Sequence, residues 1–412
     1  MRVLYLTNGF PYPLTSGYLR HFHLIRELAA DHQITLLSLA GGGYQVEDAE
    51  ALRPMVERVE AFANERSSPI GKVVRRLRAL GGGAETPAVT AMSERAAELH
   101  ADRSFDVVVH SGKSTHPVLD RLPGLPVAAD LCDATSSRLA GAIQFARPAR
   151  RPALWLDLQA MRRIEAGIVR RAAHVMFASE RDRRLIMGTS GAPAASIVPN
   201  GVDLDFWRRT SPTLGRDRIV FTGAMHYPPN VDAALVLAEG VLPLVRHRIP
   251  EASLDIVGRD PAPVLLALAG RPGIRVTGFV PDVRPYLDGA SVFAAPLRFG
   301  AGIQNKLLEA LAMELPVVAS TLAIDGLRVG HEAPPAVVAD DLAVMADRIV
   351  EALEAVRRDP AAPPNAAGRA YVQASFRWET SGRRLAEILR SVAASTPPVA
   401  AAKRSSDAAT RP

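Results

Sequence analysis

Cysteine and aromatic residues are scarce in this chain, and each scarcity excludes a class of protein. Cys132 is the single cysteine among 412 residues, so the sequence can form no internal disulfide and offers no cysteine cluster to a metal ion. Aromatic residues make up 5% of the chain and do not alternate with basic residues, as the stacking platforms of nucleic-acid-binding proteins do. We therefore expect no bound metal, no cofactor and no nucleic-acid partner.

Long apolar runs are also missing. No stretch of eighteen apolar residues occurs, and the first apolar segment is too short for a signal peptide and is soon followed by Pro11 and Pro13. These absences predict a cytoplasmic protein without a membrane-spanning helix. The 48% of hydrophobic and 22% of charged residues are typical of a globular protein, and 412 residues are enough for two domains.

The net charge of +6 is concentrated in the first half of the chain. Residues 66–80 contain five basic side chains and no acid, and residues 138–184 contain eleven arginines against four acids. Such regions fit an anionic membrane surface or a phosphate-bearing acceptor, and they are equally typical of solvated helix faces in an arginine-rich proteome. One hypothesis is therefore peripheral contact with the inner face of the cytoplasmic membrane.

Short apolar runs alternate with helical stretches in the first half of the chain. This pattern is typical of a parallel sheet whose two faces are covered by helices. A helix is predicted at about 18–30, and strands are predicted at 2–7, 33–39, 105–109, 126–130 and 173–178. A turn at 199–203 and a polar stretch at 208–217 then separate this unit from a second one.

The alternation restarts after the polar stretch. Further strands are predicted at 218–223, 253–258, 274–277, 291–295 and 316–319, and helices at 231–248, 261–269, 282–288 and 340–356. The sequence thus predicts an α/β protein of two Rossmann-like, doubly wound parallel-sheet domains, 1–205 and 206–378. Their ligand is expected in the cleft between them, at the carboxyl ends of the strands. An Ala-, Pro- and Ser-rich tail, 394–412, is predicted to be disordered.

The segment 296–310 carries the strongest functional signal. A strand ends here, Gly300 and Gly302 interrupt the chain, and a helix begins, so free N–H groups with roughly half a positive charge can face a phosphate. Lys306 and Glu309 share one face of that helix, where the lysine can meet an anion and the carboxylate can accept hydrogen bonds from sugar hydroxyls. Lysine occurs at only four positions among 49 basic residues, which modestly favours this interpretation over a surface ion pair. Phosphate plus sugar indicates a nucleotide-sugar site.

A series of short motifs in the second half of the chain resembles a known family. The motifs lie at 199–203, 221–225, 229–232, 256–258, 277–284, 295–298 and 302–306, and continue to 316–319. They resemble the donor domain of GT-B-fold retaining glycosyltransferases of family 4 (glycosyl transferases group 1). They are similar in particular to the sugar transferases of exosortase-linked exopolysaccharide loci. The likeness spans about 1–392 and is specific from 199 to 327.

This resemblance implies a fold, an activity and a set of site residues. The fold is GT-B, with a last helix at about 379–393 that crosses back onto the N-terminal domain. The activity is metal-independent transfer of a hexose with retention, in which the catalytic residues are His110, Lys306 and Glu309. Glu309 would hold the ribose and Lys306 the phosphates. The other donor-binding residues that it implies are Gly17, Gly223, Arg259, Phe279, Val280, Gly300, Gly302, Ile303, Gln304 and Asn305.

Two positions depart from the family pattern. The usual first acid of the motif, eight residues before Glu309, is Ala301 here, and that acid normally contacts the transferred sugar. The usual Arg and Lys after the first strand of the donor domain are replaced by the stretch 224–229. Lys306 is the residue that would compensate in a Gly-x-Gly…Lys form of the motif, and Arg259 is a further candidate phosphate ligand.

Several polar residues of the first domain have alternative interpretations. His116 competes with His110 for the position that faces the sugar. Asp130 and Asp133 follow a predicted strand, where they either contact the acceptor or cap the next helix, and capping is the interpretation that we favour. Glu165 lies among arginines on a predicted helix and is interpreted as a member of a surface ion pair.

The predicted function is transfer of a sugar from a nucleotide-diphosphate sugar to a glycan or lipid-linked acceptor, in exopolysaccharide or cell-surface glycan synthesis. Charge that develops on the departing diphosphate would be stabilised by Lys306, the helix dipole and backbone N–H groups. The alternatives are a nucleotide-sugar epimerase or hydrolase, and a non-catalytic nucleotide-sugar-binding subunit. A nicotinamide dehydrogenase is disfavoured, because Asn305 occupies the third glycine of the dinucleotide fingerprint and the next strand ends at Ser320 without an acid.

Overall fold

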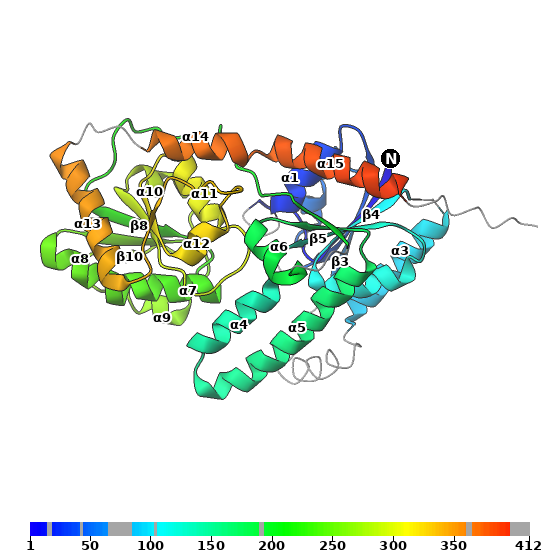
Figure 1. Cartoon of the computed structure of the whole chain (residues 1–412), viewed down its shortest axis with the longest axis horizontal. Helices are drawn as coiled ribbons and strands as arrows, with labels where there is room; N and C mark the ends of the chain where they lie inside the picture. The colour runs from blue at the N-terminus through cyan, green and yellow to red at the C-terminus, as the bar shows by residue number, and fades with distance from the viewer. Residues whose placement is uncertain are drawn as a thin grey trace, which may run out of the picture.

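The structure is a computed structural model and describes residues 1–14, 19–41, 44–64, 85–102, 105–188, 193–359 and 365–395. It contains two sheets in which every paired strand runs parallel to its neighbour. The first has seven strands in the order β3-β2-β1-β4-β5-β6-β7, and the second has six in the order β10-β9-β8-β11-β12-β13. Figure 1 shows the two units side by side, each with helices around its sheet. The predicted pair of doubly wound units is confirmed.

The central strands are buried on both faces, as their unbroken apolar runs predict. The first sheet consists of β1 (Arg2–Thr7), β2 (Gln33–Ala40), β3 (Arg58–Ala63), β4 (Val107–Ser111), β5 (Val127–Cys132), β6 (His174–Phe177) and β7 (Ala194–Ile197). The second consists of β8 (Arg218–Thr222), β9 (Ser253–Val257), β10 (Ile274–Val276), β11 (Val292–Ala295), β12 (Val317–Ala319) and β13 (Val337–Val338). The sequence patterns missed β3, β7 and β13, which are edge strands with half-exposed or exposed residues.

Helices connect the strands and cover both faces of each sheet. In the first unit they are α1 (Leu19–Leu28), α3 (Pro87–Asp102), α4 (Thr135–Phe145), α5 (Arg151–Arg171) and α6 (Glu180–Met187), with 3-10 segments Val46–Ala49, Lys113–Arg121 and Pro148–Arg150. In the second unit they are α7 (Pro228–Leu235), α8 (Leu242–Arg248), α9 (Pro263–Leu266), α10 (Arg284–Asp288), α11 (Asn305–Ala312), α12 (Thr321–Asp325) and α13 (Leu342–Arg358). The helix predicted at 231–248 starts at Pro228 and includes a π-helical segment, Val236–Val241.

The last two helices, α14 (Ala366–Ser375) and α15 (Trp378–Ala394), run along both units at the top of Figure 1. Helix α15 crosses back and adds apolar side chains to the core beneath the first sheet, namely Leu385, Ile388, Leu389 and Val392. The predicted crossover helix is therefore present. The two segments that pass between the units bind each other, because Val202 donates its N–H to the carbonyl of Phe376 at 2.8 Å and Ser381 donates its hydroxyl to the carbonyl of Pro199 at 2.8 Å.

One helical stretch in the described part of the chain, Pro228–Arg248, is long and apolar enough to pass for a membrane span. Its apolar residues are largely core residues of the second unit, and 56% of its most apolar window is buried inside the molecule. The apolar composition of this stretch is thus explained by its packing against α9 and α13 in the core of the second unit.

Candidate functional site

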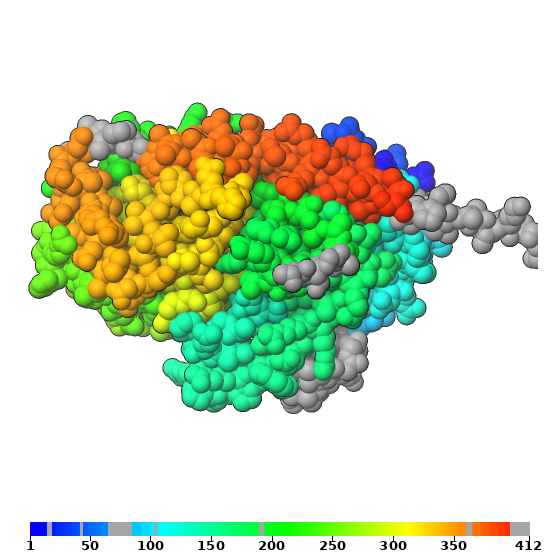
Figure 2. Space-filling view, in the orientation of Figure 1, coloured from blue at the N-terminus to red at the C-terminus, as the bar shows by residue number. Residues whose placement is uncertain are grey.

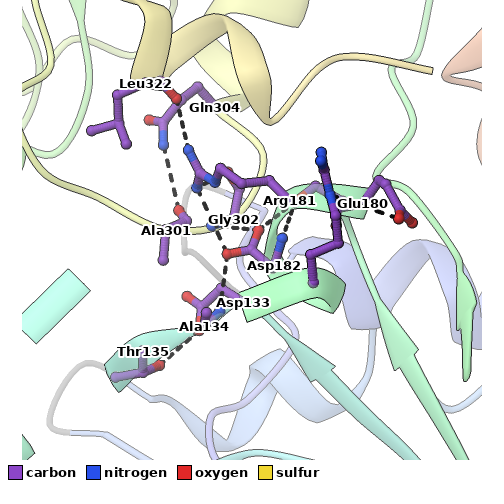
Figure 3. A network of polar contacts seen from close by, with 12 residues as sticks. Asp133, Ala134, Thr135, Glu180, Arg181, Asp182, Ala301, Gly302, Gln304 and Leu322 are labelled. Carbon is purple, nitrogen blue, oxygen red and sulfur yellow. Dashed lines mark hydrogen bonds and ion pairs between the residues drawn. The ribbon is translucent and has the colours of Figure 1, made fainter. Parts of the chain in front are cut away.

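The carboxyl ends of the two sheets face each other across the interface between the units. Gly302, which follows β11 of the second sheet, lies against Asp133 and Asp182, which follow β5 and β6 of the first. Figure 3 shows this contact, with the loop of residues 301–304 next to the start of α6. The predicted site is therefore located where strand ends from both units meet, as expected for doubly wound sheets.

Gly302 is the residue of the glycine-rich segment whose backbone requires glycine. Its φ is +73°, and a Cβ atom here would lie 3.3 Å from the Cβ atom of Asp133. Gly300 has no such requirement, since a Cβ atom there would only reach Gln304 at 3.7 Å. The N–H of Gly302 was predicted to face a ligand, but the carboxylate of Asp182 accepts it at 3.1 Å.

Helix α11 begins directly after this segment, at the position that the sequence predicts, with Gln304 as the residue before its first turn. The backbone N–H groups of Ile303, Gln304 and Asn305 have no acceptor among the residues that the structure describes. Unsatisfied donors at a helix start are the usual binding groups for a phosphate. These three residues, rather than Gly302, therefore offer the open donors of the predicted cradle.

Lys306 lies in the first turn of α11, points into the interior of the second unit and is only 9% exposed. Its ammonium donates to the side-chain carbonyl of Asn230 and lies 4.6 Å from the centroid of the Phe221 ring. A Cβ atom on Gly223 would lie 3.1 Å from this ammonium, so glycine leaves room beside it. The structure thus brings the predicted residues Lys306 and Gly223 together and adds Asn230, which the sequence analysis did not assign to the site.

Glu309 lies one turn further along α11 and is half-buried. Within the described residues its carboxylate has no hydrogen-bond partner, and no ion pair joins it to Lys306, so the interpretation as a surface ion pair is wrong. Burial lowers the pKa of Lys306 to about 7, against the opposing charge of Glu309. Burial likewise raises the pKa of Glu309 to about 7, against the charge of Lys306. Both groups therefore change charge near neutral pH.

A chain of polar side chains connects the start of α11 to the interior of the first unit. Asn200 donates its amide N–H to Oδ1 of Asn305 at 2.8 Å and accepts a hydrogen bond from Arg20 at 2.8 Å. Arg20 also binds both carboxylate oxygens of Asp130, at 2.8 and 3.2 Å, and both side chains are almost fully buried. Burial alone would raise the pKa of Asp130, but the charge and hydrogen bonds of Arg20 lower it below its usual range.

Asp130 and Asp133 do not cap α4, contrary to the favoured interpretation. Asp130 is occupied by Arg20, and Oδ1 of Asp133 accepts from Lys113 at 2.8 Å and from Thr135 at 2.7 Å. Two side chains distant in sequence instead accept the hydrogen bonds that the N–H groups at the start of α4 donate. Asp182 accepts the N–H of Ala134 at 3.1 Å, and Glu165 accepts the N–H of Ser136 at 3.2 Å.

Glu165 is therefore a buried residue and not a member of a surface ion pair. Its exposure is 2%, and its carboxylate points to the start of α4 rather than to the neighbouring arginines. Burial raises its pKa above the usual range, although the hydrogen bond from Ser136 opposes this shift. Helical periodicity could have indicated this position, because Glu165 shares a helix face with the buried Leu158 and Ile168.

His110 is buried near the end of β4, where its Nε2 atom lies 3.2 Å from the hydroxyl of Thr115. Burial lowers its pKa to about 3, so the imidazole is neutral at physiological pH. His116 is half-buried on the 3-10 segment Lys113–Arg121, with Nδ1 3.0 Å from the carbonyl of Lys113. A third histidine, His21, was missed by the sequence analysis and lies 3.2 Å from the hydroxyl of Ser111.

The remaining predicted residues follow other strands of the second sheet at the same edge. Arg259 follows β9, where its carbonyl accepts the N–H of Met225 and its side chain binds the neighbouring Asp260 at 3.0 Å. Phe279 follows β10 and is 63% exposed, and Val280 is half-buried beside it. Gly17, the basic region 66–80 and most of the predicted disordered tail lie outside the described residues.

Comparison with known proteins places the second unit within a family model. Residues 216–355 match the model of glycosyl transferases group 1. A GDP-mannose-dependent alpha-(1-6)-phosphatidylinositol monomannoside mannosyltransferase of Mycobacterium tuberculosis is 35% identical over 242 residues, which are 52% of this chain and 61% of the relative. A phosphatidyl-myo-inositol mannosyltransferase of the same species is 32% identical over 234 residues, which are 53% of this chain and 59% of the relative. The chain thus spans about three fifths of the length of these curated relatives.

Solved structures match nearly the whole chain. Anabaena HepE in complex with UDP-glucose has a TM-score of 0.65 at 15% identity, over 95% of this chain and 100% of that protein. TarM has a TM-score of 0.66 at 10% identity, over 94% of this chain and 99% of that protein. These likenesses, together with two facing parallel sheets and a helix that returns to the first of them, show that the chain has the GT-B fold.

Proposed function

We propose that this protein is a glycosyltransferase that moves a hexose from a nucleotide-diphosphate sugar to a glycan or lipid-linked acceptor, with retention and without a metal. The observation that carries the proposal is the environment of Lys306. Its ammonium is buried at a helix start, binds only the neutral side chain of Asn230 among the described residues, and has a pKa lowered to about 7. A diphosphate would supply the ion-pair partner that this ammonium lacks among the described residues.

The donor would extend along the carboxyl edge of the second sheet. The free N–H groups of Ile303, Gln304 and Asn305 suit the phosphates together with Lys306. Glu309, whose carboxylate has no partner among the described residues, suits the ribose hydroxyls. The exposed loop at 279–280 suits the base. The family match over 216–355 and the nucleotide sugars named for related proteins support a nucleotide sugar as the donor.

Departure of the nucleoside diphosphate leaves negative charge on its phosphate oxygens. Lys306 and the start of α11 would stabilise that charge as it develops, because they are held in place before the bond breaks. His110, neutral and buried at the end of β4, can donate or accept one hydrogen bond to the sugar but cannot serve as a charged acid at neutral pH. Closure of the two units would exclude water from the reacting carbon.

The donor-site proposal is tested by thermal unfolding with UDP, GDP, ADP and NAD. A ligand present at about a hundred times its dissociation constant stabilises a protein by roughly 2.7 kcal/mol. We expect one nucleoside diphosphate to raise the Tm of the wild type and to leave the Tm of Lys306→Ala and of Glu309→Ala unchanged. Arg271→Ala is the matched control, because Arg271 is a basic residue of the second unit that pairs with Glu239 away from this edge. A shift with NAD alone contradicts the proposal.

Transfer itself is tested with the nucleotide sugar that carries the selected base. We expect release of nucleoside diphosphate to depend on an added glycan or lipid-linked acceptor. Release without any acceptor would instead indicate a hydrolase, and an altered sugar without release would indicate an epimerase. Binding without either reaction would indicate a non-catalytic subunit, an alternative that Ala301 favours because alanine offers no side-chain contact to the sugar.

The proposed acceptor lies at the inner face of the membrane, in exopolysaccharide or cell-surface glycan synthesis. The hairpin of α4 and α5 projects from the body of the molecule at the lower edge of Figure 2. Its exposed side carries Trp155 and four arginines, Arg151, Arg162, Arg163 and Arg170. Basic residues around an exposed tryptophan fit an anionic bilayer surface.

Co-sedimentation with liposomes that contain anionic lipid tests this membrane contact. We expect binding at low salt, weaker binding at high salt, and loss of binding in Arg151→Glu/Arg162→Glu. The control is Arg271→Glu, which reverses an exposed charge on the second unit. Absence of binding at low salt would remove the membrane from the proposal and leave a soluble glycan as the acceptor.

A further inference from the structure

Two adjacent residues of the first unit hold both polar backbone atoms of Gly302. Asp182 accepts the N–H of Gly302 at 3.1 Å, and Nη2 of Arg181 approaches its carbonyl oxygen at 3.4 Å (Figure 3). We propose that Arg181 and Asp182 are positioning residues that lock the glycine-rich segment in the conformation that leaves the N–H groups of residues 303–305 free for a nucleoside diphosphate. The proposal rests on the proposed function, and it implies that the donor site is complete only when the two units are closed.

Asp182 connects three parts of the molecule through one carboxylate. Oδ1 accepts the N–H of Ala134 at the start of α4, at 3.1 Å, and Oδ2 accepts both the hydroxyl of Ser179 and the N–H of Gly302. The side chain is fully buried. Because a buried carboxylate is costly unless its oxygens are hydrogen-bonded, opening of the units would leave Oδ2 with one acceptor bond fewer. The contact with Gly302 thus favours the closed arrangement.

Arg181 contacts the second unit through two carbonyl groups. Nη1 donates to the carbonyl of Leu322 at 2.7 Å, and Nη2 to that of Gly302. Its only described partner in the first unit is the neighbouring Asp182, 3.7 Å away. The Nε atom of Arg181 is buried without a partner in the described part of the chain. This guanidinium is therefore bound mainly by the second unit. Its hydrogen bonds to the second unit can form only when the two units are closed.

Gly302 is closely packed between residues of both units. A Cβ atom on Gly302 would lie 3.3 Å from Asp133 of the first unit, and a Cβ atom on Gly326 would lie 2.8 Å from the carbonyl oxygen of Gly302. Glycine at both positions permits this close approach. The carbonyl oxygen is therefore enclosed between Gly326 on one side and the guanidinium of Arg181 on the other, which fixes the direction of the residues that follow.

The first test needs no ligand. We compare the radius of gyration of the ligand-free wild type, Arg181→Gln and Asp182→Asn by small-angle X-ray scattering. The matched controls are Glu180→Gln and Arg183→Gln, which remove the same charges from the same helix turn. In the described part of the chain, Glu180 pairs with Arg183 and Arg184 of its own helix and not with the second unit. We expect a larger radius for both test variants and an unchanged radius for both controls. Equal radii for all five proteins would overturn the proposal.

The second test measures donor affinity by titration of UDP, GDP and ADP. We expect the dissociation constant of the nucleoside diphosphate that binds to rise about tenfold in Arg181→Gln and Asp182→Asn and to stay unchanged in the controls. Arg181→Gln is decisive, because Asp182→Asn also disturbs the start of α4. Wild-type affinity in Arg181→Gln would overturn the positioning role. If none of UDP, GDP and ADP binds to the wild type, the proposed function fails, and the scattering result alone decides whether the two residues hold the units closed.

Discussion

The side-chain amide of Asn200 donates a hydrogen bond to Oδ1 of Asn305 across 2.8 Å, and so joins the first unit to the first residue of α11. Oδ1 of the same Asn200 accepts a hydrogen bond from Arg20, which is paired with the buried Asp130. A continuous series of polar contacts therefore leads from the interior of the first sheet to the helix that carries Lys306. Substitutions on one side of the interface are therefore expected to be energetically coupled to substitutions on the other side.

A double-mutant cycle measures that connection. We expect Asn200→Ala to lower the free energy of unfolding by about 1–3 kcal/mol, because Arg20 is left buried without one acceptor. Asn305→Ala should cost less, since Asn305 is half-buried and water can replace its partner. The coupling between the two substitutions should be about 0.5–1.5 kcal/mol in urea unfolding. Additive effects would contradict a direct hydrogen bond.

Nucleotide affinity should depend on pH with a maximum near neutrality. Lys306 loses its proton as the pH rises through about 7, which removes the ammonium that a diphosphate requires. Glu309 gains a proton as the pH falls through about 7, which weakens it as an acceptor for ribose hydroxyls. Calorimetric titration of the selected nucleoside diphosphate between about pH 5 and pH 9 should therefore show affinity falling on both sides of neutrality.

Two variants separate the limbs of that profile. Glu309→Gln should remove the acidic limb and shift the alkaline limb to lower pH, because the carboxylate charge that raises the pKa of Lys306 is lost. Lys306→Arg should remove the alkaline limb, since a guanidinium remains charged throughout this range. A wild-type profile that both variants retain would show that neither residue contacts the ligand.

Glu165 should lower stability at neutral pH rather than raise it. Its pKa in the folded protein is raised by burial, so ionisation of the folded state is unfavourable above the pKa of the unfolded chain, and that penalty disappears as the pH falls below it. Glu165→Gln keeps the acceptor for Ser136 and should raise the free energy of unfolding at pH 8. The gain should shrink toward pH 5 in urea unfolding. A constant gain would contradict the assigned titration.

Gly201 is required where the chain crosses from the first unit to the second. A Cβ atom there would lie 2.3 Å from the backbone nitrogen of Trp378 and 2.6 Å from its ring, and neither group can move aside without displacing α15. We expect Gly201→Ala to lower the free energy of unfolding by about 1–3 kcal/mol. Gly270→Ala is the control, because a Cβ atom at Gly270 meets nothing within 4 Å. Equal stability of the two variants would contradict this packing.

Sequence patterns predicted the central strands and the glycine-to-helix junction because both depend on neighbouring residues. The core of β1 is an unbroken apolar run, and α11 begins at Asn305, three residues after Gly302. The edge strands β3 and β13 were missed because exposed edges carry little apolar pattern. The order of the other strands and helices was enough to predict the fold class without these edge strands.

The polar partners could not be predicted in the same way. Asn230 binds Lys306, and Asp182 binds Gly302, through contacts that bring together residues far apart in the chain. No local spacing connects Asn200 with Asn305. Glu165 was misassigned because the sequence shows only the arginines beside it. The packing of α4 on α5 is what brings its carboxylate to the N–H of Ser136.

The position of α15 has a consequence for synthesis of the protein. Leu385, Ile388 and Leu389 belong to the same core as Leu24 and Ile25, although more than 350 residues separate these two groups along the chain. A ribosome that has already produced the whole second unit has therefore not yet supplied the side chains that cover the first. The unit that is translated first is therefore completed last. Until translation ends, the apolar surface that α15 will cover stays exposed, and we expect the nascent chain to bind a chaperone there.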